Sequence, residues 1–115
     1  MSSFATIRLA SKIIQKNLSS DGFTEFLKWP KARYIVAFTN NVITKEKDIA
    51  KVYSQIRSNS TLESLTIGGW KDSATGKFYL DLGIATDSLE YALAKAREWN
   101  QIAIFDLKEF VEIRA

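Results

Sequence analysis

The sequence contains neither cysteine nor histidine, and only one of its 115 residues is proline. Without cysteine the chain has no disulfide, no thiol nucleophile and no thiolate metal ligand. Without histidine it lacks the usual general base near neutral pH and the commonest metal ligand. Most nucleophilic and metal-dependent chemistry is thereby excluded, so we expect a protein that is not an enzyme and has no catalytic, cofactor or metal site.

Carboxylates do not restore such a site. Asp72, Asp81, Asp87 and Asp106 lie in or near predicted strands and loops, but none follows the spacing of a D-x-D pair or a calcium loop. Asp87 is better explained as a helix cap, and Asp106 as a side chain that satisfies backbone groups of a turn.

Long hydrophobic runs are also absent. No apolar stretch reaches the roughly 18 residues of a membrane-spanning helix. The N-terminal MSSFATIRLASK has neither the apolar stretch nor the cleavage site of a secretory signal, so we expect a cytoplasmic location and no membrane association. With 46% hydrophobic and 25% charged residues and no linker or low-complexity segment, residues 1–115 are expected to form a single globular domain.

Positive charge is concentrated at the start of the chain. The formal net charge is +3, but residues 1–33 alone carry +4. Their basic side chains are candidate contacts for a partner or for nucleic acid: Arg8, Lys12, Lys16, Lys28, Lys31 and Arg33. A helix would align Arg8, Lys12 and Lys16 in a stripe. That stripe is either a solvated face opposite an apolar set (Phe4, Ile7, Ile14 and Leu18), or a surface for an acidic partner or nucleic-acid phosphates.

The hydrophobic pattern predicts a clear order of elements. A helix over 4–17 and a short apolar segment over 23–29 form an N-terminal helical extension (1–30) ahead of a core (31–115). In the core we expect strands at 34–38, 62–70, 78–85 and 102–107, and a short terminal strand at 109–113. Helices should follow caps at Thr44 and Asp87, with apolar faces of Ile49, Val52, Tyr53 and Ile56, and of Leu89, Ala92, Leu93, Ala96 and Trp99.

The order β-α-β-β-α-β after the first helix predicts a ferredoxin-like α+β sandwich, with two helices on one face of the sheet and the first and third strands in its centre. The first strand, 34–38, is apolar at every position, so both faces of the sheet should be covered there. We expect the N-terminal helix to cover the second face, with a second subunit as the alternative.

The stretch GGWKDSATGKFYLDLG, residues 68–83, contains Gly-Lys but does not fit a phosphate-binding loop. That loop needs Gly at position 71 and Ser or Thr at position 78, where this chain has Lys71 and Phe78. We expect a hairpin loop that binds no nucleotide, with Gly76 at positive φ. If Lys71 pairs with Lys77, Trp70 lies opposite Phe78. For Gly68-Gly69 we favour a β-bulge over a close approach of a side chain or ligand.

Two classes of function remain. The element order is shared with RNA-recognition modules, but in KFYLDL, residues 77–82, Asp81 would lie on the same face as Lys77 and Tyr79 and repel phosphate. We therefore expect a protein-interaction or accessory module, with self-association or a protein partner. The alternative is a nucleic-acid-binding module that uses the basic N-terminal third.

Four segments carry a resemblance to a known group: YIVAFTNN, IGGWKDSATGKFYLDLGI, EYALAKAREW and NQIAIFDL. Residues 34–107 resemble a family of small uncharacterised bacterial and phage α+β domains. The resemblance implies a bacterial or phage origin and no established activity, and it leaves residues 1–30 outside. If that family has a shared site, this chain matches it at Trp70, Asn100 and Gln101; otherwise Trp70 packs and Asn100-Gln101 joins a helix to a strand.

Overall fold

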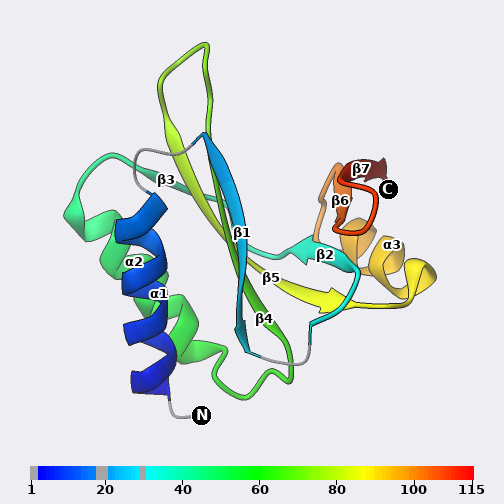
Figure 1. The fold of residues 1–115 in the computed structure, drawn as a ribbon, viewed down its shortest axis with the longest axis horizontal. Coiled ribbons are helices and arrows are strands. Elements are labelled where there is room, and N and C mark those ends of the chain that lie inside the picture. Colours follow the sequence, from blue (N-terminus) through cyan, green and yellow to red (C-terminus); the bar gives the residue numbers. More distant parts are fainter. Residues whose placement is uncertain (1–2, 18–20, 29–30) are drawn as a thin grey trace.

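The computed structural model describes residues 3–17 (side chains from residue 5), 21–28 and 31–115. These residues form an α+β fold with three helices and a seven-stranded antiparallel sheet (Figure 1). The helices are α1 (Ser3–Asn17), α2 (Glu46–Ser58) and α3 (Leu89–Glu98). The strands are β1 (Gly22–Lys28), β2 (Tyr34–Ala37), β3 (Asn41–Ile43), β4 (Leu65–Lys71), β5 (Phe78–Thr86), β6 (Ala103–Asp106) and β7 (Val111–Arg114).

The strand order is β1-β4-β5-β2-β6-β7, and β3 also pairs with β5. The predicted first and third strands, β2 and β5, are therefore neighbours inside the sheet. The predicted terminal strand exists as β7. The apolar segment after the first helix was assigned to a helical extension, and this is wrong, because residues 22–28 form the edge strand β1 on β4. Trp29 of that segment lies outside the described residues.

All three helices lie on one face of the sheet. Leu80, Leu82 and Ile84 alternate along β5 and so point to the same side. The first two belong to a core under α1 and α2 that contains Ala10, Ile14, Val52, Ile56, Leu65 and Ile67. Ile84 packs against a second core under α3, formed by Tyr34, Val36, Ala92, Ala96 and Ile104.

The expectation that the N-terminal helix covers the second face is therefore wrong. Helix α1 packs beside α2 and against β1 (Figure 1), with Ala10 fully buried and Ile14 3% exposed. The reason lies in β1, which widens the sheet beyond what α2 alone can cover, so that α1 covers the added surface. Ile7 is half-buried in this contact, whereas the side chains of Phe4 and Leu18 lie outside the described part of the chain.

Both predicted helix caps are displaced by one residue. Helix α3 is capped by Ser88, whose Oγ accepts a hydrogen bond from Tyr91 N at 3.1 Å, and not by Asp87. Helix α2 has Lys45 at its N-cap position instead of Thr44; Thr44 N and Oγ1 both donate to Asp48 Oδ2 at 2.9 Å. The predicted apolar face of α3 is buried at Ala92 and Ala96, half-buried at Leu93 and Trp99, and exposed at Leu89.

Gly68 and Gly69 do not form a bulge. Strand β4 pairs in continuous register with β1 and β5 through both glycines. The alternative, close approach of a side chain, is what occurs at Gly69, where an added Cβ would lie 2.3 Å from Cε1 of Phe23. The irregularity of this part of the sheet lies in β1 instead, between Phe26 and Lys28.

The hairpin loop between β4 and β5 is confirmed. Asp72 N donates to Lys77 O at 2.8 Å, Gly76 N donates to Asp72 O at 2.7 Å, and Gly76 has a φ of 74°. The predicted strand register is wrong by one residue, because Asp72 pairs with Lys77 at the loop and Lys71 pairs with Phe78. Trp70 consequently lies opposite Tyr79 and not Phe78.

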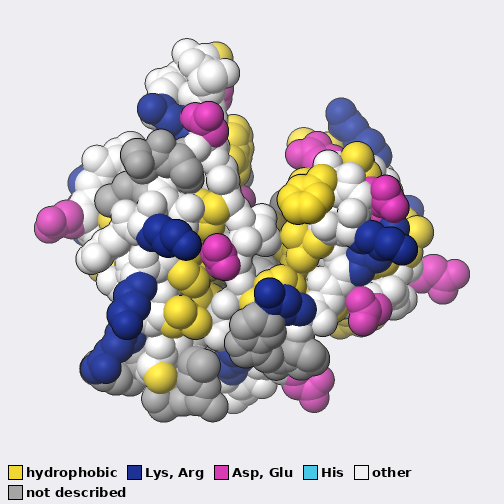
Figure 2. All heavy atoms as spheres, viewed as in Figure 1, with side chains coloured by type: hydrophobic (Ala, Val, Ile, Leu, Met, Phe, Trp, Pro, Cys, Tyr) yellow, Lys and Arg dark blue, Asp and Glu magenta, His cyan; other side chains and the backbone are white. Residues whose placement is uncertain are grey.

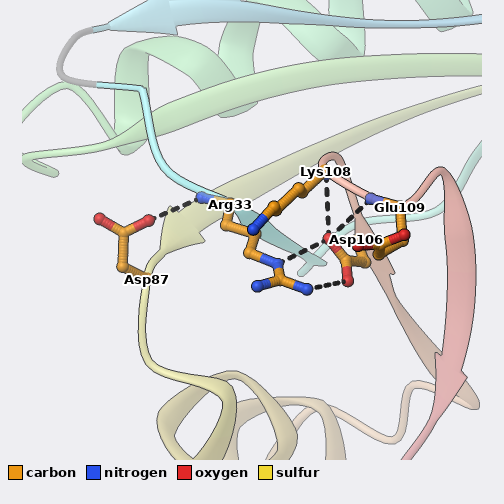
Figure 3. A network of polar contacts seen from close by, with 5 residues as sticks. All are labelled: Arg33, Asp87, Asp106, Lys108 and Glu109. Carbon is orange, nitrogen blue, oxygen red and sulfur yellow. Dashed lines mark hydrogen bonds and ion pairs between the residues drawn. The ribbon is translucent and has the colours of Figure 1, made fainter.

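A polar clamp joins the start of β2 to the turn between β6 and β7 (Figure 3). Arg33 Nε and Nη2 each donate to the carboxylate of Asp106 at 2.9 Å, and Lys108 N and Glu109 N donate to Asp106 Oδ1 at 2.9 and 3.3 Å. Arg33 N donates to Asp87 Oδ1 at 2.9 Å. Asp106 thus satisfies the turn backbone, as its sequence position indicated.

The clamp should make the free energy of unfolding fall as the pH is lowered into the acid range. The hydrogen bonds from Arg33, with those from the turn, lower the pKa of Asp106 to about 2 despite its burial, whereas an unfolded chain has an Asp pKa of about 3.9. The stabilising contribution is therefore complete above the unfolded pKa and is lost as pH falls toward the folded one. We expect Asp106→Asn to lower the free energy of unfolding in urea at neutral pH, with a deficit that shrinks across this window. Arg33→Met should weaken the same pH dependence, because the backbone hydrogen bonds from Lys108 and Glu109 remain. A deficit of Asp106→Asn that does not vary with pH would contradict the assignment.

Candidate functional site

The second face of the sheet is hollowed into a groove of about 730 Å³. No helix among the described residues covers it, and the strands on both sides of the sheet centre line it, from β1 and β4 to β6 and β7. Figure 2 shows the hollow between the two halves of the molecule, with hydrophobic side chains along it. We call this surface the groove.

Small residues form the floor of the groove. Gly68, Gly83, Ala37 and Ala103 line it together with the larger Ile35 and Phe105, so little side-chain volume fills the glycine and alanine positions. At Gly83 the close packing requires glycine, because an added Cβ would lie 2.7 Å from the backbone oxygen of Val36. A depression in the middle of the sheet follows from these residue types.

Aromatic side chains stand at opposite ends of the groove. Trp70 of β4 stacks on Tyr79 of β5 with ring centroids 4.3 Å apart and an angle of 9° between the planes, and it is 44% exposed. Phe110, between β6 and β7, packs edge-on against Phe105 at 6.1 Å and is 77% exposed. Its φ of 55° is unfavourable for a bulky residue. Exposed rings of this kind are typical of surfaces that bind partners.

Asp81 places a carboxylate in the groove. Burial raises the pKa of Asp81 to about 6, while polar interactions with the Asn41 backbone and the Trp70 side chain oppose the rise. Its Oδ1 is buried and accepts no hydrogen bond in the described structure. Glu112 of β7 is the other acidic residue of the lining, and none of the described lining residues is Lys or Arg. The groove is therefore aromatic, apolar and negatively charged.

The predicted basic residues do not converge on one surface. Arg8, Lys12 and Lys16 are exposed along α1, which both interpretations of the stripe require. Lys28 instead donates through Nζ to the backbone oxygens of Ser60 and Leu62, tying β1 to the connection before β4. Lys31 is exposed, with Nζ 5.9 Å from the Phe26 ring centroid, and Arg33 belongs to the clamp. None of the six lines the groove.

The structure separates the three residues of the suspected shared site. Trp70 and Gln101 both line the groove, at its β4 end and before β6. Asn100 does not; with a φ of 55° it ends helix α3, and Gln101 N donates to Ala96 O at 2.7 Å across this turn. Asn100 therefore joins helix to strand.

Two groove residues, Asp81 and Phe110, were not predicted as binding residues from the sequence. Asp81 was considered as a carboxylate without metal-ligand spacing and as a residue that repels phosphate, although an acidic residue inside the otherwise apolar strand FYLDLGIA is itself a signal of a functional side chain. Phe110 was assigned to a terminal strand. Nothing in its local sequence indicates that it is exposed beside the groove.

Neither a metal-binding cluster nor a helix able to span a membrane is found among residues 3–17, 21–28 and 31–115. Among them no group of three or more acidic side chains is arranged to hold a metal ion. No helix formed by these residues has the length and apolar character needed to cross a membrane.

No protein-family model, curated protein or solved structure matches this chain.

Proposed function

We propose that this protein is a non-catalytic interaction module that binds a protein partner in the groove. The observation that carries the proposal is an open, concave sheet face with exposed Trp70 and Phe110 at its ends. Aromatic side chains are enriched in the buried core of protein interfaces. The lining offers no nucleophile paired with a base, which favours binding over catalysis.

The proposal also covers the topology of the fold and the origin of the protein. The strand order β6-β2-β5-β4, with α2 and α3 on one face, supports a ferredoxin-like core to which α1, β1 and β7 are added. Together with the resemblance over residues 34–107, it suggests a small cytoplasmic accessory domain of bacterial or phage origin.

Peptide selection tests whether the groove binds. Peptides selected from a random library displayed on phage should lose binding to Ala103→Gln, which places a long neutral side chain on the groove floor. The same substitution at the exposed Ala50 of α2 is the matched control and should leave binding unchanged. We call peptides groove-dependent when they lose binding to Ala103→Gln and keep binding to Ala50→Gln. Selection that yields none of them would refute the proposed function.

Nucleic-acid binding is the second candidate, because Arg8, Lys12 and Lys16 are all exposed on one helix. Anisotropy titrations with short single- and double-stranded oligonucleotides at two salt concentrations would detect it. This function requires salt-sensitive affinity that is lost when the three residues are changed to serine and retained in Ala103→Gln.

A further inference from the structure

The charge of the groove is opposite to that of the chain as a whole. The chain carries a formal net charge of +3, yet the acidic residues of the groove lining are Asp81 and Glu112 and no described lining residue is basic. A partner segment that carries positive charge is therefore complementary to the groove.

Asp81 is the less solvated of these two carboxylates. Gly68, opposite it on β4, contributes no side chain, and Asp81 Oδ1 is buried without a hydrogen bond in the described structure, while the Trp70 side chain interacts with the same carboxylate. No described Lys or Arg forms an ion pair with it. A carboxylate that is poorly solvated and unpaired gains more from an incoming cation than an exposed one does.

The aromatic pair beside Asp81 narrows the choice of cation. Trp70 is the next groove-facing residue of β4 after Gly68, and it is 44% exposed while it stacks on Tyr79. A guanidinium group can lie flat on an aromatic ring while its N–H groups meet a carboxylate, which an ammonium cannot do equally well. We infer that the groove binds an exposed basic segment of a partner protein, with an arginine side chain against Trp70 and its charge at Asp81. This inference rests on the proposed function and names the chemistry of the partner.

The test repeats the selection from the random peptide library on the wild-type chain, on Asp81→Asn and on Glu63→Gln. Glu63 is exposed in the connection before β4 and does not line the groove, so its neutralisation should leave the selection unchanged. Groove-dependent peptides selected on the wild type should be enriched in arginine, and the enrichment should disappear on Asp81→Asn. Asparagine keeps the shape of Asp81 and removes an unpaired charge, so Asp81→Asn should fold, as its thermal unfolding would confirm.

A synthetic pair of peptides makes the test quantitative. In the best groove-dependent peptide, replacing arginine by neutral citrulline should weaken binding to the wild type by about ten- to a hundredfold and to Asp81→Asn by less than about threefold. Groove-dependent peptides without arginine enrichment, or an equal loss on both proteins, would overturn the inference and leave the proposed function standing. Should Asp81→Asn fail to fold, the inference is tested by two results on the wild type alone: the arginine enrichment of the groove-dependent peptides and the loss of affinity on replacing arginine by citrulline. Absence of any groove-dependent peptide would overturn both.

Discussion

Replacing Ala10 with aspartate should remove a large share of the free energy that stabilises the folded protein. Ala10 is fully buried where α1 packs on the core under α1 and α2. A carboxylate there would lie among the apolar side chains of this core. An uncompensated buried charge costs about 3 to 5 kcal/mol, a large share of the roughly 5 to 15 kcal/mol that stabilises a typical domain. Urea unfolding followed by circular dichroism measures the loss.

The same substitution at Ala50 is the control. Ala50 is exposed on α2, so Ala50→Asp should cost only its helix propensity, about 0.7 kcal/mol. Equal and small losses for the two variants would show that α1 is not part of the folded core.

Replacing Ile67 with alanine should have the second largest effect. Ile67 is fully buried in β4, between β1 and β5, and belongs to the core under α1 and α2. Removing its side chain leaves a cavity where the surrounding strands are held by hydrogen bonds, so we expect a loss of about 2 to 5 kcal/mol in the free energy of unfolding.

Glu25 provides the control for this variant. It is the cross-strand partner of Ile67 on β1 but is exposed, and Glu25→Ala should change the free energy of unfolding by less than about 0.5 kcal/mol. A loss of less than about 1 kcal/mol for Ile67→Ala would mean that the helices do not pack on this face as described.

Periodic segments were predictable from the sequence. The helix over 4–17, the apolar face of α2 and the positive φ of Gly76 follow from local patterns that tertiary contacts reinforce. The single-residue error at the cap of α3 has a tertiary cause. Ser88 and Asp87 are both good caps, and their choice depends on Arg33, which is distant in sequence and holds Asp87 through its backbone N–H.

The larger errors come from contacts between distant parts of the chain. An apolar segment as short as 23–29 does not reveal whether it forms a helix or an edge strand, and only its pairing with β4 decides this. Once β1 is placed, α1 must cover the widened face, and the second face is left open. The groove therefore depends on the position of β1, and no local pattern in the sequence could have predicted it.

The Phe23 ring over Gly69 also has a consequence for the order of folding. A slip of one residue between β1 and β4 would turn the Phe23 ring to the other face of the sheet and leave Gly69 uncovered, so only one register fits. Leu80 of β5 lies opposite Gly69 and belongs to the core against which Phe23 packs, so pairing of β4 with β5 through their short hairpin completes the surface that receives the ring. Strand β1 should therefore dock late, and its fixed register limits exchange of this strand between molecules while the protein folds.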